Sequence, residues 1–412
     1  MRWQEISLEE NNMKSISFAF PVKYGIRGPK EKYMPAIINL GDEICKCYGI
    51  SFPRNYVYTD EPINKFCLSR IPTIISRYII GYLQKIVRFP EYYIYWSNII
   101  VFDLLFSRRI SRDESKIVFT HPLLNRTIEK CKKAGKIVVV EAPNSDPRRE
   151  HSRIMRDYEL FHIKNKFIYG NKMFRDMWIY GYDSADKIIA ISNLSLNTYL
   201  NAGYPEEKFE MIPLTGSEFV KTNKVPNLKK DKAFITCAHH SFIKGTHRLL
   251  LAWKKANIKD IKLYVVGKLC EDMKEFVDNN GPFENVIFTG ELTDLPELYN
   301  RLDGVGVQLS LSEGAVRVTP EMMAFGFPMV TTIDASCDLV IDGKTGFIVD
   351  VENEEEIIKT LTHISTSWND LSNLKENIDL VLRGRTVCDF SSELGKYLKQ
   401  LADDGGISGE IK

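Results

Sequence analysis

The stretch that decides the fold is residues 117–141, IVFTHPLLNRTIEKCKKAGKIVVVE. Two continuous apolar runs, residues 117–120 and 136–141, flank a segment of helical character. That segment, residues 122–134, is followed by Gly135, and glycine suits the position just after a helix. Continuous apolar runs are typical of strands in a parallel sheet that is covered on both faces. The stretch therefore predicts a strand, a helix and a second strand of a parallel α/β sheet.

The same alternation of strand and helix continues in both directions. Residues 15–22 and 185–192 predict further strands of a first sheet. Residues 221–232 are polar, basic and without periodicity, and they predict a linker. Beyond it the alternation begins again, with strands expected at residues 233–238, 261–266, 286–289, 304–309, 328–331 and 346–349. This pattern predicts an α/β fold of two Rossmann-like domains, residues 13–220 and 233–384, that face each other across an interdomain cleft.

The composition narrows the class of protein. The 412 residues carry 55 Lys and Arg against 54 Asp and Glu, which is not the basic excess typical of a nucleic-acid-binding protein. No apolar run reaches the length of about 18 residues that a membrane span needs, and the first residues lack the apolar segment of a secretory signal. The eight cysteines include no C-x-x-C pair, as expected for buried thiols in a reducing compartment. We therefore expect a cytoplasmic protein without a metal site.

The segment with the clearest chemistry is residues 310–321, SLSEGAVRVTPE, which follows an expected strand. Its two carboxylates, Glu313 and Glu321, are eight positions apart, and both are expected to face the cleft. Carboxylates are good acceptors for sugar hydroxyls. Thr319 is expected to be the N-cap of the next helix, with Pro320 at the first helical position, and such a helix start can hold a phosphate. The alternative is that Glu321 only complements the helix dipole and that Glu313 is a solvated loop residue.

This segment resembles the E-x7-E signature of the retaining GT-B glycosyltransferases of family 4. The residues after Glu321 read MMAFGFPMV, where the family has approximately A-M-A-x-G-x-P-V-V. Other segments agree with the family in order and spacing, namely residues 185–192, 203–213, 242–245, 286–309 and 343–347. The resemblance implies a GT-B fold with an N-terminal acceptor-binding domain and a C-terminal domain that binds a nucleotide sugar. It also implies that a C-terminal helix, residues 385–403, packs back on the N-terminal domain.

The resemblance implies a role for each matching residue. Glu321 would bind the ribose of a nucleotide sugar, and Glu313 would bind the donor hexose. Lys244 would pair with the diphosphate and stabilise the leaving group. The implied donor-binding residues are Glu321, Gly314, Ala315, Val316, His239, Gly245, Arg317 and Thr319, with the backbone amides of residues 314–316 near the sugar and diphosphate. GT-B enzymes generally need no metal, and the sequence has no D-x-D acid pair, so no metal or other cofactor is expected.

Two positions depart from the pattern of the family. An Arg commonly stands five positions before the loop Lys, and here that position is His239, which lacks the fork and the constant charge of arginine. Arg317 is a candidate substitute, and otherwise it is a surface charge. The Phe-Gly that usually follows Glu-Gly is replaced by Ala315 and Val316, which leaves the backbone amides intact.

Two residues are candidates for the acceptor side. Asp146 stands where many relatives have a His, and it would orient or deprotonate the acceptor hydroxyl; the alternative is a turn residue before Pro147. His121, at the end of an expected strand, would lie at the edge of the cleft; the alternative is a histidine that caps the strand. The candidate catalytic residues are thus Glu313, Lys244, Asp146 and His121.

Residues 72–110 interleave Arg and Lys with Ile, Tyr, Phe and Trp. Such a mixture suits a membrane interface, where aromatic rings lie at the headgroups and basic side chains meet anionic lipid. The alternative is a set of ordinary core helices with solvated charges.

Together these features predict a retaining transferase that moves a hexose from a nucleoside diphosphate sugar to a glycan or glycolipid acceptor. A UDP-sugar is favoured over a GDP-sugar, and the acceptor is expected to be a glycan or lipid-linked glycan of surface polysaccharide or glycoconjugate biosynthesis, at the inner face of a membrane. No carboxylate is an obvious nucleophile, which favours a same-face reaction in which the leaving phosphate accepts the acceptor proton. The alternatives are a glycogen- or sucrose-type transferase, a catalytically silent GT-B partner protein and an epimerase of nucleotide sugars.

Overall fold

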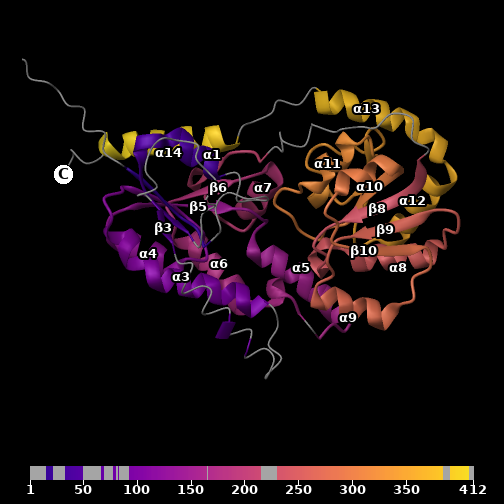
Figure 1. The fold of residues 1–412 in the computed structure, drawn as a ribbon, viewed down its shortest axis with the longest axis horizontal. Coiled ribbons are helices and arrows are strands. Elements are labelled where there is room, and N and C mark those ends of the chain that lie inside the picture. Colours follow the sequence, from indigo (N-terminus) through magenta and orange to yellow (C-terminus); the bar gives the residue numbers. More distant parts are fainter. Residues whose placement is uncertain are drawn as a thin grey trace, which may run out of the picture. The chain divides into compact units, whose positions relative to one another are not determined.

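The computed structural model describes residues 15–21, 33–49, 66–68, 78–79, 82, 92–164, 166–214, 230–383 and 390–407. Within this part of the chain the strands form two sheets (Figure 1). The first sheet has seven strands in the order β3-β2-β1-β4-β5-β6-β7, and the second has six in the order β10-β9-β8-β11-β12-β13. Every pair whose register is resolved runs parallel. The predicted α/β class with two parallel sheets is confirmed.

The strands of the first sheet are β1 (Ile16–Ala19), β2 (Ile44–Gly49), β3 (Phe66–Leu68), β4 (Ile117–Thr120), β5 (Ile137–Ala142), β6 (Lys187–Ala190) and β7 (Phe209–Met211). The helices in this part of the sequence are α1 (Tyr33–Leu40), α3 (Tyr92–Arg112), α4 (Asn125–Lys133), α5 (Pro147–Leu160), α6 (Lys172–Ser184) and α7 (Asn193–Asn201). Short 3-10 helices are η1 (Gly41–Glu43), η3 (Ile168–Gly170) and η4 (Glu206–Lys208).

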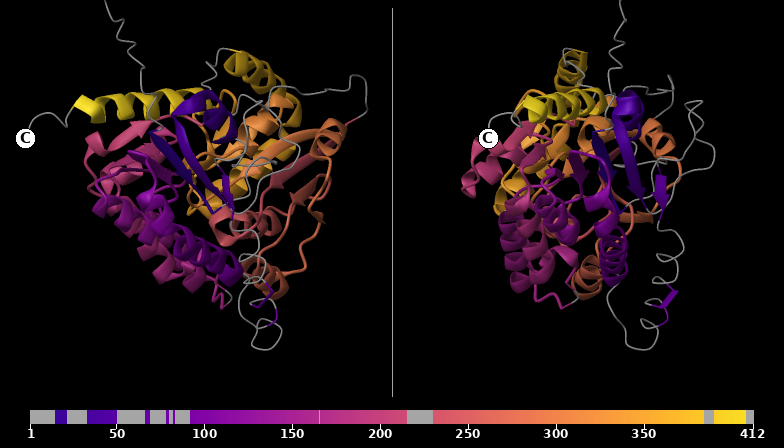
Figure 2. Two further views of the ribbon diagram at one scale, coloured as in Figure 1. Left: turned by 60° about the vertical axis from the view of Figure 1, so that its left-hand side comes forward. Right: turned by 90° about the vertical axis from the view of Figure 1, so that its left-hand side faces the viewer.

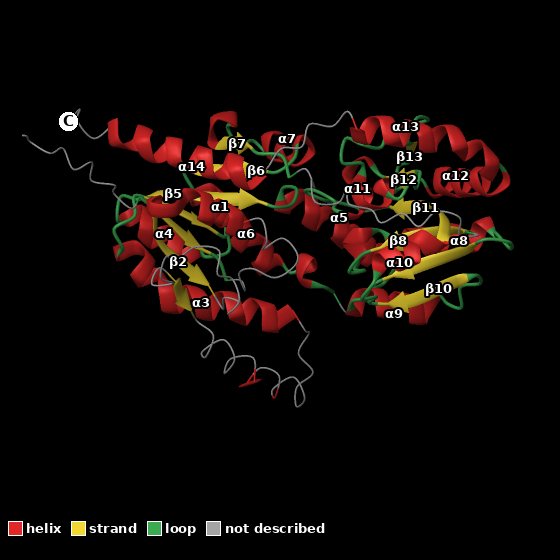
Figure 3. Ribbon diagram, turned by 45° about the horizontal axis from the view of Figure 1, so that its top comes forward, coloured by secondary structure: helices red, strands yellow, loops and turns green. Residues whose placement is uncertain are grey.

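The strands of the second sheet are β8 (Asp231–Cys237), β9 (Lys262–Val266), β10 (Val286–Gly290), β11 (Leu302–Gln308), β12 (Met329–Thr331) and β13 (Gly346–Ile348), and several lie side by side in Figure 3. The accompanying helices are α8 (Thr246–Ala256), α9 (Glu271–Asn280), α10 (Leu295–Arg301), α11 (Val318–Ala324), α12 (Glu354–Thr366), α13 (Ser372–Arg383) and α14 (Phe390–Ile407). The 3-10 helices are η6 (Phe242–Lys244), η7 (Ile333–Ala335) and η8 (Trp368–Leu371).

The stretch at residues 117–141 folds as a strand, a helix and a strand. All four residues of β4 are buried, and so are all residues of β5 except the first, as expected for strands covered on both faces. Gly135 has φ +76°, which is the left-handed conformation that favours glycine after a helix. The predicted start of α4 at residue 122 is wrong. The chain first makes a turn, in which the side-chain amide of Asn125 donates to the carbonyl of Pro122 at 2.9 Å.

The contacts of the chain divide it into two compact units. Unit 1 comprises Met1–Glu141, Tyr180–Ile189 and Phe390–Lys412, and unit 2 comprises Ala142–Ile179 and Ala190–Asp389. Within unit 1, α14 lies against α1 (Figure 2). The domain boundaries expected from the sequence stay a prediction. Asp231 and Lys232, the last two residues of the expected linker, begin β8, and residues 221–229 lie outside the described part of the chain.

The helix α5 belongs to unit 2 and packs into the core around the second sheet. Ile154 and Tyr158 are almost fully buried there, in one apolar cluster with Phe234, Phe242 and Trp253. The Tyr158 hydroxyl donates to a carboxylate oxygen of Asp272 at 2.9 Å. This second-sheet core therefore includes side chains that come from the sequence before the expected linker.

A buried ion pair fastens α5 to α8. Arg248 donates to both carboxylate oxygens of Asp157 at 2.8 and 2.6 Å, and Nε2 of His247 lies 2.8 Å from Oδ2 of the same residue. Asp157 and His247 are both 0% exposed. Burial alone would raise the pKa of the Asp157 carboxyl. The hydrogen bonds from Arg248 and His247 outweigh burial and hold the pKa well below its usual range.

This shift predicts a pH-dependent stability. A carboxyl whose pKa is lower in the folded than in the unfolded chain stabilises the fold above the unfolded value, here 3.8, and that contribution is lost as the pH falls through the folded value. Asp157→Asn is expected to lower the free energy of unfolding at pH 7 by about 2 kcal/mol, because charge-assisted hydrogen bonds are lost. Urea denaturation at several pH values measures the difference, which should shrink below about pH 4. The exposed Asp278→Asn is the control, and an equal effect of both substitutions would contradict the assignment.

Candidate functional site

Glu313 and Lys244 come together in unit 2. Glu313 lies in the loop after β11, and Lys244 is the last residue of η6, which follows β8. Nζ of Lys244 lies 2.6 Å from Oε1 of Glu313, and the Ser310 hydroxyl donates to the same oxygen at 2.7 Å. Glu313 is only 8% exposed, so solvent ions screen the pair weakly. Two residues that the resemblance assigns to different parts of the donor are therefore direct partners.

Backbone contacts explain how this pair forms. The amide of Leu311 donates to the carbonyl of Ile243 at 2.8 Å, which joins the loop after β11 to η6. Gly245 has φ +67°, and a Cβ atom there would lie 1.7 Å from the carbonyl oxygen of Leu309. Only glycine fits, because the left-handed backbone and the close carbonyl both exclude a side chain. Gly245 thus positions Lys244, and its own contact with a donor stays a prediction.

The carbonyls of the loop at residues 313–314 are held by hydroxyl groups. Ser145 donates to the carbonyl of Glu313 at 2.7 Å, and Ser192 donates to that of Gly314 at 2.5 Å. A Cβ atom on Gly314 would lie 2.0 Å from the carbonyl oxygen of Pro143. Among the described residues, the amides of residues 314–316 donate no hydrogen bond. The loop, including Ala315 and Val316, therefore has its carbonyls fixed and its amides available.

Glu321 lies in the first turn of α11 and is partly buried. Burial raises the pKa of its carboxyl, and the nearby positive charge of Arg317 opposes the rise. Within the described part of the chain its side chain forms no hydrogen bond or ion pair with Glu313 or Lys244. The structure thus joins Glu313 to Lys244 but does not link Glu321 directly to either.

The predicted N-cap at Thr319 is wrong. The helix α11 begins at Val318, and the residue before it, Arg317, forms no side-chain cap bond. The Thr319 hydroxyl is buried and donates to the carbonyl of Ala335 at 2.8 Å, because η7 packs against this end of α11. Thr319 therefore ties the loop at residues 333–335 to the helix, and its predicted contact with a donor stays a prediction.

The two histidines after β8 differ in environment. His240 is fully buried, with its ring nitrogens 2.8 Å from the Thr246 hydroxyl and 2.9 Å from the carbonyl of Val266. Burial lowers its pKa to about 4, so at neutral pH it is uncharged and donates to that carbonyl. His239 is exposed, with Nδ1 3.3 Å from Sγ of Cys270. Of the two, only His239 is accessible to a ligand, and its replacement of an arginine stays a prediction.

The two acceptor-side candidates have structural partners. Asp146 is 1% exposed, caps α5 by accepting from the amide of Arg148 at 2.8 Å, and pairs with the Arg148 guanidinium at 2.9 Å. Asp146 is thus the N-cap of a helix, whereas the alternative expected from the sequence was a turn residue. His121 follows β4 in unit 1, and its Nδ1 accepts from the amide of Leu123 at 3.2 Å. A catalytic role of either residue stays a prediction.

Side chains of α5 contact the loop after β11. Arg149 donates to both carboxylate oxygens of Asp334 at 2.7 and 2.9 Å and to Ser312 at 3.3 Å. Arg153 donates to Asp334 at 2.9 Å and also to the carbonyl of Leu311. Asp334 is 3% exposed, so this network is buried at its centre. The sequence did not single out these residues, because neither their spacing nor their type marks them.

A further acidic residue near the pair was also missed. Glu150 lies in the first turn of α5 and is 8% exposed. Burial, and then the negative charge of Glu313, raises the pKa of Glu150 to about 8, while Lys244 and Arg149 oppose the rise. In the sequence it is one acid among many in a charged helical region, so no signal distinguished it.

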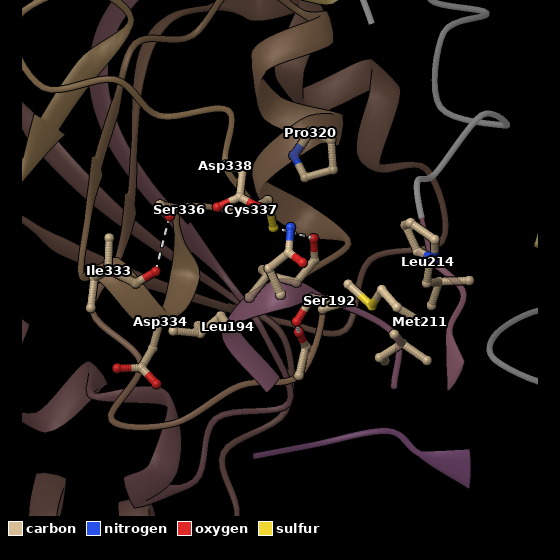
Figure 4. Close-up of a pocket in the computed structure, with 16 residues that line it drawn as sticks. Ser192, Leu194, Met211, Leu214, Pro320, Ile333, Asp334, Ser336, Cys337 and Asp338 are labelled. Atoms are coloured by element: carbon tan, nitrogen blue, oxygen red, sulfur yellow. Dashed lines mark hydrogen bonds between the residues drawn. The ribbon is translucent and has the colours of Figure 1, made fainter. Parts of the chain in front are cut away.

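A pocket borders the loop at residues 314–316. Figure 4 shows Ser192, Met211 and Leu214 among the residues that line it, together with Pro320 of α11. The carboxylate of Asp334 points away from the other labelled side chains, toward its arginine partners. Apolar side chains and hydroxyl groups therefore surround a space next to the predicted donor-binding amides.

Part of the chain is similar in sequence to known glycosyltransferases. Residues 219–380 match the family model described as glycosyl transferases group 1. The chain is 26% identical over 231 residues to the capsular polysaccharide biosynthesis glycosyltransferase CapM of Staphylococcus aureus. That alignment covers 51% of this chain, and the chain spans 59% of the length of this curated relative.

Solved structures of similar fold cover nearly the whole chain. HepE of Anabaena, crystallised with UDP and glucose, gives a TM-score of 0.58 at 15% identity, over 94% of this chain and 99% of that one. WaaG, a glycosyltransferase involved in lipopolysaccharide biosynthesis, gives a TM-score of 0.59 at 13% identity. The match covers 93% of this chain and 99% of that one. Sucrose-phosphate synthase of Thermosynechococcus elongatus gives a TM-score of 0.61 at 14% identity, and the match covers 94% of this chain and 99% of that one. The GT-B fold is confirmed, and residues 219–380 are similar to the glycosyl transferases group 1 family.

Proposed function

We propose that the chain is a retaining glycosyltransferase that moves a hexose from a nucleoside diphosphate sugar to a glycan or lipid-linked glycan. The observation that carries this proposal is the ion pair of Lys244 and Glu313 beside the available amides of residues 314–316. Such a site offers a cation and N–H donors to a diphosphate and a carboxylate to sugar hydroxyls. The capsular polysaccharide enzyme among the relatives supports an acceptor of this class.

Each residue has a defined part in the proposed reaction. Lys244 attracts the diphosphate and stabilises the charge that develops on it, Glu313 accepts hydrogen bonds from the hexose, and Glu321 accepts them from the ribose. The bond from the anomeric carbon to the phosphate oxygen breaks and leaves its electron pair on that oxygen. The acceptor oxygen bonds the anomeric carbon from the same face, and its proton passes to the leaving phosphate.

The donor base, the retaining course and the independence from a metal are supported by comparison with other proteins. A UDP-sugar donor is favoured because HepE was crystallised with UDP. The retaining course and the independence from a metal come from the resemblance to family 4. A covalent glycosyl adduct on an acidic side chain, detected by mass spectrometry, would contradict the same-face reaction.

A ligand screen tests the donor class. The melting temperature of the protein is expected to rise with either UDP or GDP and the corresponding sugars, because a ligand that binds only the folded state stabilises it. Release of free nucleotide from the same panel of nucleotide sugars is then expected for one donor. If no nucleotide raises the melting temperature, the proposal is wrong. Binding without turnover of any donor, even with acceptor glycans added, would indicate the silent partner protein instead.

We also propose that the N-terminal part contacts an anionic membrane, at the cytoplasmic face, where a lipid-linked acceptor would lie. Of residues 72–110, the structure describes residues 78–79, 82 and 92–110, and none of the described helices is long and apolar enough to cross a bilayer. The helix α3 exposes the apolar residues Ile100, Leu104 and Leu105. Arg109 and Arg112 are exposed in its last turn, and Arg108 is exposed just before it. Apolar and basic side chains on one helix suit an anionic interface.

Vesicle flotation tests this surface. The double substitution Arg108→Gln and Arg109→Gln is expected to lower partitioning to anionic vesicles by about tenfold or more, because each basic side chain near such a surface contributes about 1 kcal/mol. Lys359→Gln, at an exposed position in unit 2, is the control. Equal flotation with neutral and anionic vesicles, or no flotation of the wild type, would contradict the proposal.

A further inference from the structure

The α5 segment bonds to three consecutive residues of the loop after β11. Its bonding side chains stand at positions 145, 149 and 153, four apart, and the two within the helix share one face of it. Their partners are, in reverse order, residues 311–313. Ser145 donates to the carbonyl of Glu313 at 2.7 Å, Arg149 to the hydroxyl of Ser312 at 3.3 Å, and Arg153 to the carbonyl of Leu311. One side of α5 therefore holds the loop at Glu313 and at the two residues before it.

The carboxylate of Asp334, on η7, is shared by both arginines. It accepts from Arg149 at 2.7 and 2.9 Å and from Arg153 at 2.9 Å. Asp334 is 3% exposed, whereas the side chains of Arg149 and Arg153 are 30% and 24% exposed. A bidentate pair of guanidinium and carboxylate permits a narrow range of geometries. The buried Asp334 therefore sets the direction from which each arginine reaches the loop.

The segment at residues 332–337, which contains Asp334, also bonds to the rest of the donor loop and to α11. The Thr332 hydroxyl donates to the carbonyl of Ser310 at 2.8 Å, the Thr319 hydroxyl donates to the carbonyl of Ala335 at 2.8 Å, and the Cys337 thiol donates to the carbonyl of Val316 at 3.0 Å. Glu321 stands two positions after Thr319, in the first turn of α11. The segment thus connects the loop that carries Glu313 to the helix that carries Glu321.

On the basis of the proposed function, we infer that Arg149, Arg153 and Asp334 are positioning residues that hold Glu313 in register with Glu321. The donor is one covalent molecule, so the acid for its hexose and the acid for its ribose must stand at a matching distance from each other. The two arginines fix the loop of Glu313 to Asp334, and the segment of Asp334 is fixed to α11. A misplacement of about 1 Å in such a site can lower a rate by about 100-fold.

Loss of the Arg149 contact is expected to slow the reaction more than it weakens nucleotide binding. Glu321 and Lys244 lie on other elements, α11 and η6, and they remain to bind the ribose and the diphosphate. Glu313 lies in the loop that Arg149 holds, so the hexose would be held less accurately. A variant that binds the nucleotide normally but reacts slowly has lost an interaction that matters in the transition state.

Arg149→Met and its matched control Arg156→Met test the inference. Arg156 lies on the same helix, is 48% exposed and pairs with Glu352. For Arg149→Met, the rate of nucleotide release at saturating donor is expected to fall by about tenfold or more. The dissociation constant of UDP or GDP, whichever binds the wild type, should stay within about threefold in calorimetric titration. Arg156→Met should match the wild type in both measurements.

A second variant keeps the test independent of the folding of Arg149→Met. Arg149→Lys keeps a charge beside Asp334 but lacks the fork that also reaches Ser312, so it should show the same split between rate and affinity. Circular dichroism establishes that each variant is folded.

Three outcomes would overturn the inference. Folded Arg149 variants with the wild-type rate would overturn it and leave the proposed function standing. A loss of nucleotide affinity as large as the loss of rate would show that Arg149 binds the diphosphate itself, again with the proposed function intact. Absence of turnover by the wild type with every donor would overturn both.

Discussion

Replacing Glu313 by glutamine is expected to reduce the rate of sugar transfer by about 100- to 1,000-fold, the usual cost of losing one electrostatic partner of a transition state. The substitution removes the charge that pairs with Lys244 at 2.6 Å and leaves a half-buried lysine beside a neutral amide. The amide is also a poorer acceptor for sugar hydroxyls than a carboxylate. Initial rates with the donor identified by the ligand screen measure the loss.

Glu355→Gln is the matched control, because Glu355 is 86% exposed on α12 and its one ion pair among the described residues is with Lys359 at 4.0 Å. The control should transfer sugar at the wild-type rate. Circular dichroism and the melting temperature establish that Glu313→Gln is folded. A folded Glu313→Gln variant with unchanged turnover would remove the basis of the proposed function.

Gly245→Ala is expected to destabilise the protein by at least about 3 kcal/mol, because backbone strain and a steric clash combine. At φ +67° any Cβ atom is disfavoured, and this one would lie 1.7 Å from the carbonyl oxygen of Leu309. Relief of the clash requires the loop with Lys244 to move away from the end of β11. The variant should therefore lose donor binding as well as stability, and thermal and urea denaturation measure the latter.

Gly343→Ala separates the two causes. Gly343 has φ +68°, almost the same as Gly245, but a Cβ atom there would meet no atom within 4 Å. This control should cost only the strain of the left-handed backbone, about 1 kcal/mol. The difference between the two variants isolates the contact with Leu309. Equal destabilisation by Gly245→Ala and Gly343→Ala would contradict the close approach of residue 245 to the carbonyl oxygen of Leu309.

The sequence predicted the repeating part of the fold because local patterns determine it. The apolar runs at residues 117–120 and 137–142 form strands wherever both faces of a sheet are covered, and Gly135 ends the helix between them for a local steric reason. Asn353 caps α12 for a similarly local reason, since its side chain accepts from the amide of Glu356. The resemblance assigned Lys244 and Glu313 to the donor site, but their ion pair was not predicted from the sequence.

The parts that the sequence did not predict depend on contacts between distant residues. Nothing in the residues around Glu150 distinguishes it from the exposed Glu159, because its burial arises where α5 meets the loop after β11. Arg149 and Ser312, which make that contact, are 163 positions apart. Thr319 was expected to cap α11 from its type and its neighbour Pro320, but its partner Ala335 lies on η7. For residues such as Thr319 and Arg149, the residue type indicates that a polar contact forms but does not indicate which residue is the partner.

The position of α5 in the second-sheet core has a practical consequence for truncation. A recombinant fragment that begins at residue 230 would keep every strand of the second sheet but lose Ile154 and Tyr158. Phe242 would then be uncovered where Tyr158 packs against it at a ring-centroid distance of 5.1 Å, and Arg248 would lose its buried carboxylate. We expect such a fragment to aggregate when it is expressed, and a fusion that restores residues 142–179 to make it soluble.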